Sequence, residues 1–211
     1  MIVYQIVKML PEHETKKLLL RYGVPTSNFR VLENIREIEN LEMKYPVVLK
    51  VSSEKIFHKT DVGAIILDIK NKEELILSYK KFKEKFPEET LIVEEMEKKG
   101  IEFISGVIND NAFGKCIMVG MGGIFTEIYK DISFRMLPVT EKEIYDMLHD
   151  LKVSKIFHGY RIKVDLKALI DILIKVSRIA EDIEIKQLDL NPIFLYERGA
   201  KVIDAKAVIG E

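Results

Sequence analysis

The chain has one cysteine and no tryptophan among its 211 residues, and its charges nearly cancel. A single cysteine cannot form a disulfide within the chain, so nothing indicates an oxidising compartment. Cys116 lies in the apolar run CIMVG, where a buried core thiol is more common than a nucleophile. The 33 basic and 34 acidic residues leave a net charge of −1, which does not steer the whole chain to nucleic acid or an anionic membrane. Any anion site must be built locally.

Long apolar runs are also missing. No stretch approaches the roughly 20 apolar residues that a membrane-spanning helix needs. The N-terminal MIVYQIVKML contains Gln5 and Lys8 and has no small-residue cleavage site, so we do not interpret it as a signal peptide. We therefore expect a cytoplasmic protein. The 47% apolar and 32% charged residues are typical of a globular chain that forms one large domain or two small ones.

Hydrophobic periodicity predicts helices and strands in mixed order, which favours an α+β fold with partly antiparallel sheets. Helices are expected at 11–23, 35–45, 71–86, 141–157 and 165–183. Strands are expected at 28–32, 46–51, 63–69, 90–96, 101–110 and 114–125, with a turn at Asn109–Gly114 between the last two. A two-stranded hairpin at 185–209 closes the chain. Pro11 suits a first helical turn, and Asn71 is a typical N-cap residue.

A polar loop, KIFHKTDVG at 55–63, follows the apolar strand at 46–51. It places His58 between two lysines, with Asp61 three residues further on. The loop is too polar for a core and has few of the residues that dominate plain turns. It is either a solvated surface loop or a segment whose charges face an anion.

Charged residues at the ends of apolar strands are further candidates. Lys50 lies in PVVLKV, where a buried ammonium needs a partner or a ligand, unless its side chain extends from the strand end to solvent. Glu94 and Glu95 end TLIVEEM, and successive strand residues point to opposite faces. One of them can pair with a lysine while the other faces a ribose or a cation, although a solvated strand end explains them equally well.

The closing hairpin carries oxygen ligands. Asp189 and Asn191 lie in LDLNP, and Asp204 lies in VIDAK on the returning strand. A turn near 197–200 brings Asn191 and Asp204 opposite one another, and such groups suit Mg²⁺, although LNP is also a common entry to a turn. The segment VGMGGIF fails the dinucleotide pattern at Phe125, so its glycines are expected to allow close approach of a ligand or a neighbouring strand.

The set of motifs resembles the β subunit of ADP-forming acetate–CoA ligase, a family related to succinyl-CoA synthetase β chains through the ATP-grasp domain. The resemblance runs from about Pro11 to the end of the chain. It rests on four segments: YPVVLKVSSEKIFHKTDVGAIILDI, LIVEEMEKKGIEFISGVINDNAFG, MVGMGGIFTEIYKDISFRMLPV and QLDLNPIFLY with VIDAK. It implies a single ATP-grasp domain over 1–211, with nucleotide held between a smaller lobe at about 22–93 and a larger lobe at about 1–21 plus 94–211.

The resemblance also implies roles for individual residues. Those expected to be catalytic are His58 and Asp61. Those expected to bind ATP or ADP are Lys50, Phe57, Lys59, Glu94, Glu95, Met96 and Glu102. Those expected to hold Mg²⁺ are Asn191 and Asp204. Glu127 and Arg135 match family positions whose roles stay open between subunit contacts and phosphate approach.

The resemblance implies a reaction in stages. An acyl-CoA yields acyl phosphate, a histidine on a separate CoA-binding α subunit takes the phosphoryl group, and ADP on this chain receives it to give ATP. The family associates as α2β2, so we expect the same assembly here, with CoA bound by the α subunit. Two alternatives stay open: a nucleotide-sensing or assembly module without transfer chemistry, and a stand-alone ATP-grasp ligase that joins a carboxylate to an amine.

Overall fold

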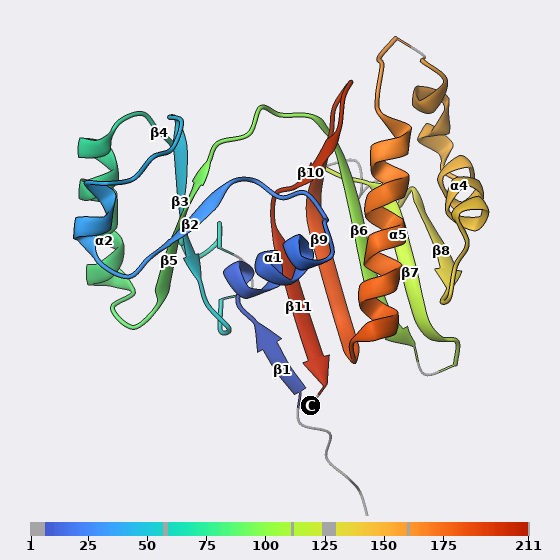
Figure 1. The fold of residues 1–211 in the computed structure, drawn as a ribbon, viewed down its shortest axis with the longest axis horizontal. Helices are drawn as coiled ribbons and strands as arrows, with labels where there is room; N and C mark the ends of the chain where they lie inside the picture. Colours follow the sequence, from blue (N-terminus) through green and yellow to red (C-terminus); the bar gives the residue numbers. More distant parts are fainter. Residues whose placement is uncertain (1–6, 57–58, 111, 124–129, 160, 211) are drawn as a thin grey trace, which may run out of the picture. The chain divides into compact units, whose positions relative to one another are not determined.

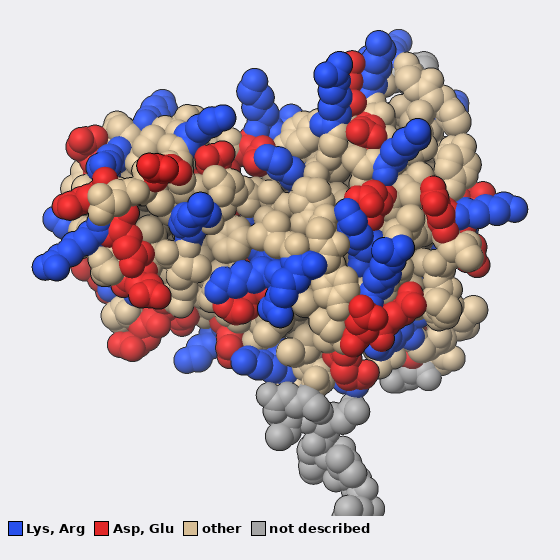
Figure 2. Space-filling view, viewed as in Figure 1, with Lys and Arg blue, Asp and Glu red and all other residues tan. Residues whose placement is uncertain are grey.

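The computed structural model describes residues 7–56, 59–110, 112–123, 130–159 and 161–210. The chain divides into two compact units. A large unit comprises residues 1–10, 14–26 and 99–211, and a small unit comprises residues 11–13 and 27–98. Within the described ranges, no helix is both long and apolar enough to cross a membrane. Figure 2 shows basic and acidic side chains interspersed over the viewed surface, as expected from a net charge of −1.

The large unit is built on a seven-stranded antiparallel sheet (Figure 1). In spatial order its main strands are β1 (Val7–Leu10), β11 (Ala205–Gly210), β9 (Ile185–Leu195), β6 (Ile101–Asp110), β7 (Gly114–Met121) and β8 (Ile132–Met136). The short strand β10 (Ala200–Val202) pairs with β9 beside β11. Because β10 and β11 both pair with β9, the closing segment folds back along one strand.

Helices cover one face of this sheet and complete its core. Helix α5 (Leu166–Asp182) packs on β6, β9 and β10, while α4 (Glu141–His149) packs on β8 and α5. Apolar residues of α5 recur at helical spacing, and eight of its residues are buried. Helix α1 (Glu12–Arg21) ends at Gly23, whose φ of +73° suits glycine at a helix C-terminus. This unit therefore has a single large apolar core beneath its helices.

The small unit has a four-stranded sheet and a core of its own. The strand order is β2 (Phe29–Leu32), β5 (Thr90–Glu95), β3 (Val47–Ser52) and β4 (Ile65–Ile69). Helix α2 (Lys72–Lys85) packs on β3 and β4, and the 3₁₀ turn η1 (Ile35–Ile38) packs on α2 (Figure 1). Every residue of β3 is buried, as its nearly continuous apolar sequence predicts.

The α+β prediction is confirmed, and most predicted elements appear within a few residues of their expected ends. Asn71 caps α2 by accepting a hydrogen bond from the Glu74 backbone N–H at 2.9 Å. The β6–β7 hairpin turns where predicted, and Asp110 accepts hydrogen bonds from the backbone of Ala112 and Phe113 in that turn. Strands β1 and β8 were not among the predicted elements.

Two predicted helices are wrong in part. Over 35–45 only η1 is helical, because the following Leu41, Met43 and Tyr45 pack on the small core in non-helical conformations. Residue 45 also precedes a proline, which disfavours helical backbone there. The helix expected over 141–157 ends at His149, and a separate 3₁₀ helix η2 (Lys152–His158) follows.

Candidate functional site

Lys50 is a buried lysine held between two carboxylates of the small unit. Lys50 is 3% exposed. Its Nζ lies 2.8 Å from Glu12 Oε1 and 3.1 Å from Glu94 Oε2. The Ser27 hydroxyl donates a hydrogen bond to the same Glu94 oxygen at 2.9 Å. The ammonium group therefore does not extend to solvent, and the interpretation of Lys50 as a solvent-reaching strand end is wrong. Buried charge of this kind persists only with close counter-charges, and two are present.

Lys59 is also buried and contacts the second carboxylate oxygen of Glu12. It is 7% exposed, and its Nζ lies 2.8 Å from Glu12 Oε2. The backbone beyond it turns back to the sheet, since Ala64 N–H donates to the Lys59 carbonyl at 2.7 Å. Asp61 is exposed in this turn. Phe57 and His58, expected to contact nucleotide and to act in catalysis, lie outside the described residues.

The end of β5 is fixed by its two neighbouring strands. Glu94 and Glu95 point to opposite sides, as predicted, because Glu95 Oε1 accepts from Asn28 Nδ2 at 3.0 Å while Glu94 faces Lys50. The Met96 backbone N–H donates to the Pro46 carbonyl at 3.0 Å, and the Met96 residue is 40% exposed. The segment 94–96 therefore has a well-defined backbone and an exposed apolar side chain at its end.

In the large unit, Glu102 lies against two glycines. The Gly122 backbone N–H donates to the Glu102 carbonyl at 2.6 Å, and a Cβ added at Gly122 would lie 2.9 Å from Glu102 Cβ. A Cβ at Gly123 would lie 3.0 Å from Glu102 Oε2. The prediction that these glycines allow close approach is confirmed for a neighbouring strand. The Glu102 carboxylate also pairs with Lys99 at 2.8 Å.

The closing segment brings Asn191 and Asp204 together. The Asn191 backbone N–H donates to the Asp204 carbonyl at 3.1 Å, in the gap between the β9 pairings with β10 and β11. Asp189 lies two residues earlier on β9, directly opposite Lys206 of β11. Burial raises the pKa of Asp189, Lys206 opposes that rise, and the Asp204 charge adds to it. A carboxylate whose ionised form is disfavoured by burial and by a second acidic side chain is in a suitable environment for a cation.

The donor set fits Mg²⁺. No cluster of three or more histidine, cysteine or acidic side chains that could hold a metal forms among the described residues. Mg²⁺, however, commonly takes only one or two protein groups and completes its shell with water and phosphate. The side-chain amide of Asn191 and the carboxylate of Asp204 would supply such hard oxygen ligands.

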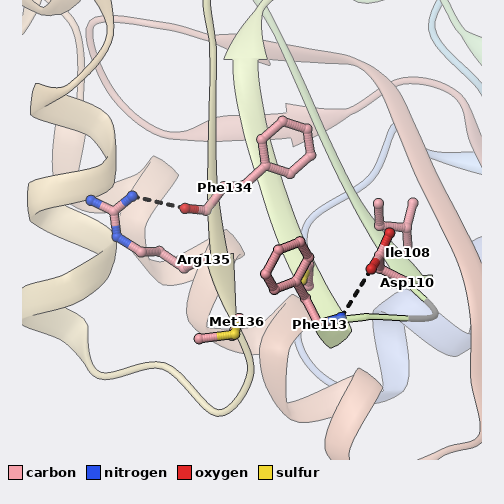
Figure 3. A pocket seen from close by; sticks show the side chains of 7 residues that line it. Ile108, Asp110, Phe113, Phe134, Arg135 and Met136 are labelled. Atoms are coloured by element: carbon pink, nitrogen blue, oxygen red, sulfur yellow. Dashed lines mark hydrogen bonds between the residues drawn. The ribbon is translucent and has the colours of Figure 1, made fainter.

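A hollow elsewhere in the large unit is lined mainly by apolar side chains. It has a volume of about 530 Å³ and lies at the β6–β7 turn and β8; Figure 3 shows its lining of Ile108, Asp110, Phe113, Phe134, Arg135 and Met136, to which Cys116 adds. Its arginine is already paired, since Arg135 Nη2 lies 2.6 Å from Asp150 Oδ2. Burial raises the pKa of the Cys116 thiol, which agrees with a core residue rather than a nucleophile. Glu127 lies outside the described residues.

The candidate residues thus form two groups. In the small unit Lys50, Lys59 and Glu94 meet through Glu12, and in the large unit Asn191 lies beside Asp204. The sequence prediction missed Glu12 and Ser27. An acid directly after Pro11 is favourable at a helix N-terminus, so its residue type alone does not indicate a further role. The only additional signal in the sequence was that a buried Lys50 requires a partner, and this signal does not say which acid supplies it.

The family model of the ATP-grasp domain matches residues 5–209, so this chain is an ATP-grasp protein, which belongs to a nucleotide-binding class. Within that class the chain belongs to the family of β subunits of ADP-forming acetate–CoA ligases. It is 38% identical over 212 residues to the acetate–CoA ligase [ADP-forming] I subunit beta of Pyrococcus furiosus, and the match covers 95% of this chain and 91% of that one.

Two further relatives extend the comparison. The acetate–CoA ligase [ADP-forming] II of Archaeoglobus fulgidus is 39% identical over 96% of this chain, which spans only 31% of that protein's length. A solved structure of the Ca. Korarchaeum cryptofilum acetyl-coenzyme A synthetase 1, in complex with coenzyme A and Mg-AMPPCP, matches with a TM-score of 0.83 and 36% identity, covering 96% of this chain and 93% of that one. The predicted ATP-grasp fold and family are confirmed by these matches.

Proposed function

We propose that this chain is the nucleotide-binding β subunit of an ADP-forming acyl-CoA synthetase, which converts acyl-CoA, ADP and phosphate to acid, CoA and ATP. The observation that carries the proposal is the convergence of Lys50 and Lys59, both buried, on the two oxygens of one carboxylate. Phosphoryl transfer depends on positioned positive charge more than on strong bases, and two fixed ammonium groups supply that charge.

The reaction is divided between two chains. On a partner α subunit, a phosphate oxygen displaces CoA from the thioester, and a histidine nitrogen then takes the phosphoryl group and releases the carboxylic acid. On this chain, a β-phosphate oxygen of ADP attacks that phosphorus; the P–N bond breaks, ATP forms and the histidine is regenerated. We expect the two chains to assemble as α2β2.

The residues of this chain have separate roles in the last step. Lys50 and Lys59 neutralise phosphate charge, and the backbone at 94–96 with Glu102 binds the base and ribose. Asn191 and Asp204 would hold Mg²⁺, and the bound ion would supply positive charge that neutralises the phosphates. His58 takes or stabilises the phosphoryl group as it passes, with Asp61 orienting the imidazole; a neutral imidazole is a nucleophile for phosphorus, and both protonation forms exist near neutral pH.

Reconstitution tests the proposal. The chain is mixed with purified α subunits of ADP-forming acetate–CoA ligases, acetyl-CoA, ADP, phosphate and Mg²⁺, and ATP is measured. We expect ATP from the mixture and none from either subunit alone. ATP formation by this chain alone would contradict the division between two subunits. If the chain binds ADP but no α subunit gives activity with it, the chain is instead identified as a nucleotide-sensing module.

A further inference from the structure

Glu12 is a buried acid of the small unit to which the proposed reaction assigns no role. Its residue is 3% exposed, and its two carboxylate oxygens contact different lysines: Oε1 lies 2.8 Å from Lys50 Nζ, and Oε2 lies 2.8 Å from Lys59 Nζ. Lys50 lies on β3, and Lys59 lies in the segment that leads to β4. One carboxylate therefore fixes two ammonium groups from different parts of the chain relative to each other.

The start of α1 is well suited to hold this carboxylate. Glu12 is the first residue of the helix and follows Pro11, and an anion is stabilised at a helix N-terminus. The next residue fixes the same end to β3, because His13 N–H donates to Ser52 Oγ at 3.0 Å and its ring Nδ1 lies 2.8 Å from that oxygen. Ser52 and Lys50 are two residues apart, so they share one side of the strand.

The charges of this cluster balance. Glu12 and Glu94 carry two negative charges, and Lys50 and Lys59 carry two positive charges. Two ammonium groups held this close in a buried site repel each other strongly unless an anion lies between them. Without the Glu12 charge the four groups carry a net charge of +1. Lys50 would keep Glu94 at 3.1 Å, but the charged carboxylate that contacts both lysines would be lost.

We propose that Glu12 is a positioning residue for phosphoryl transfer: it sets the spacing of the two lysines that meet the nucleotide phosphates. This inference rests on the proposed function. Glu12 also competes with phosphate for the same ammonium groups, since both are oxygen anions. ADP therefore binds more weakly in the ground state than it would to the two lysines without Glu12. In return, the Glu12 carboxylate holds both lysines in the positions from which they contact the phosphoryl group during transfer.

The two effects of Glu12 act in opposite directions on binding and on turnover. Glu12→Gln removes the competing charge, so the Kd for Mg·ADP stays the same or becomes several-fold tighter. It also removes from each lysine one of the contacts that hold it in position, and a misplacement of about 1 Å can reduce turnover on the order of 100-fold. A residue with a purely structural role would not separate these quantities, because partial unfolding lowers the amount of binding and the rate together.

The test compares Glu12→Gln with Glu12→Asp, and with Glu84→Gln as a control on the exposed surface of α2. Mg·ADP binding is measured by calorimetry on the chain alone, kcat and KM are measured with the α subunit, and folding is checked by circular dichroism. We expect a large loss of kcat without weaker binding in Glu12→Gln. Glu12→Asp keeps the charge on a shorter side chain, so its kcat falls between those of wild type and Glu12→Gln. The control behaves as wild type.

The outcomes separate failure of this inference from failure of the proposed function. If the wild type makes no ATP with any α subunit, the proposed function fails. Mg·ADP binding then still tests the role of Glu12. Weaker Mg·ADP binding by folded Glu12→Gln than by wild type overturns the inference. If the wild type is active, an unchanged kcat in Glu12→Gln overturns it, and so does a loss of binding as large as the loss of kcat. Should Glu12→Gln not fold, a wild-type kcat in Glu12→Asp overturns it.

Discussion

Gly122 donates its backbone N–H to the carbonyl of Glu102 at 2.6 Å, and its Cα lies so close to that residue that no side chain fits between them. Glu102 is therefore supported from one side by bare backbone. Glu102 is one of the residues proposed to bind nucleotide. A side chain in place of either glycine after β7 should therefore move Glu102 and weaken nucleotide binding.

We expect Gly122→Ala to displace Glu102. The added Cβ would lie 2.9 Å from both the Cβ and the carbonyl carbon of Glu102, and backbone cannot move aside as cheaply as the end of a side chain. Overpacking of this kind costs about 1–3 kcal/mol of unfolding free energy, measurable by urea denaturation. Weaker ADP binding should accompany it. Gly114→Asn is the control, because a Cβ there meets nothing within 4 Å and asparagine tolerates its φ of +73°. Equal stability of the two variants would contradict this account.

The Arg135–Asp150 pair should be visible in the titration of its carboxylate. The hydrogen bond from Arg135, together with its charge, lowers the pKa of Asp150 from its ordinary value of 3.8. A lowered pKa means that the pair contributes stability above the unfolded pKa and loses it as pH falls through the folded value. The Asp150 side chain is 55% exposed, so solvent screening keeps this contribution below about 1 kcal/mol.

The measurement for this pair is a carbon-13 NMR titration of the Asp150 carboxyl group. In Arg135→Gln the pKa of Asp150 should rise toward 3.8, and the difference in unfolding free energy from wild type should vanish at strongly acidic pH. Arg178→Gln, an exposed substitution on α5, should leave the titration unchanged. An unchanged Asp150 pKa in Arg135→Gln would contradict the pairing.

Cys116 should react slowly in the native protein. Its residue is 7% exposed, and burial, with the Asp110 charge as a smaller cause, raises the pKa of the thiol above its ordinary value of 9.0. The thiolate is the reactive form, so labelling with a disulfide reagent at pH 7 should be slow and should accelerate with pH. The chain unfolded in guanidinium chloride is the control and should label quickly. Cys116→Ala should retain activity; its loss would mean that the thiol takes part in the reaction.

His58→Ala tests the proposed role of the histidine in the polar loop at 55–63. Under the proposed function the variant should lose overall turnover with the α subunit while its Kd for Mg·ADP stays within a few-fold of wild type. Lys55→Ala, in the same loop, is the matched control and should keep both. A severe loss of ADP binding in His58→Ala would make His58 a binding residue and not a participant in transfer.

Local patterns in the sequence predicted much of this structure. The buried strand β3, the Asn71 cap and the β6–β7 hairpin depend on residues close in the chain, and all three were predicted. The meeting of Asn191 and Asp204 was predicted for the same reason, because a hairpin fixes which of its residues lie opposite. Much of what failed depended on distant residues.

The break between α4 and η2 illustrates this limit. The Asp131 carboxylate accepts hydrogen bonds from the backbone N–H groups of Lys152 at 2.8 Å and Val153 at 3.0 Å, and so caps a second helical segment from another part of the chain. The contact between Glu12 and Lys50 likewise joins residues 38 positions apart. Periodicity within a window of the sequence carries no information about either contact.

Asp204→Asn tests the proposed metal ligand pair in the large unit. The substitution keeps the shape of the side chain and the backbone carbonyl that accepts from Asn191, but it removes the negative charge that favours a divalent cation. We expect Mg²⁺-dependent binding of ADP to weaken at least on the order of tenfold, since even groups outside the direct shell of a metal commonly have effects of that size. Binding in the presence of EDTA should be unaffected.

Calorimetry with Mg·ADP, and with ADP plus EDTA, separates these contributions. Asp146→Asn on α4 is the matched control, because it makes the same substitution at an exposed position. The quantity to compare is the Kd for ADP in EDTA divided by the Kd for Mg·ADP. A ligand role for Asp204 requires that this ratio becomes smaller than in wild type in Asp204→Asn and stays at the wild-type value in Asp146→Asn. If the ratio is unchanged in Asp204→Asn, Mg²⁺ draws on other groups, and Asp189, whose raised pKa reflects burial and the neighbouring Asp204, becomes the next carboxylate to test.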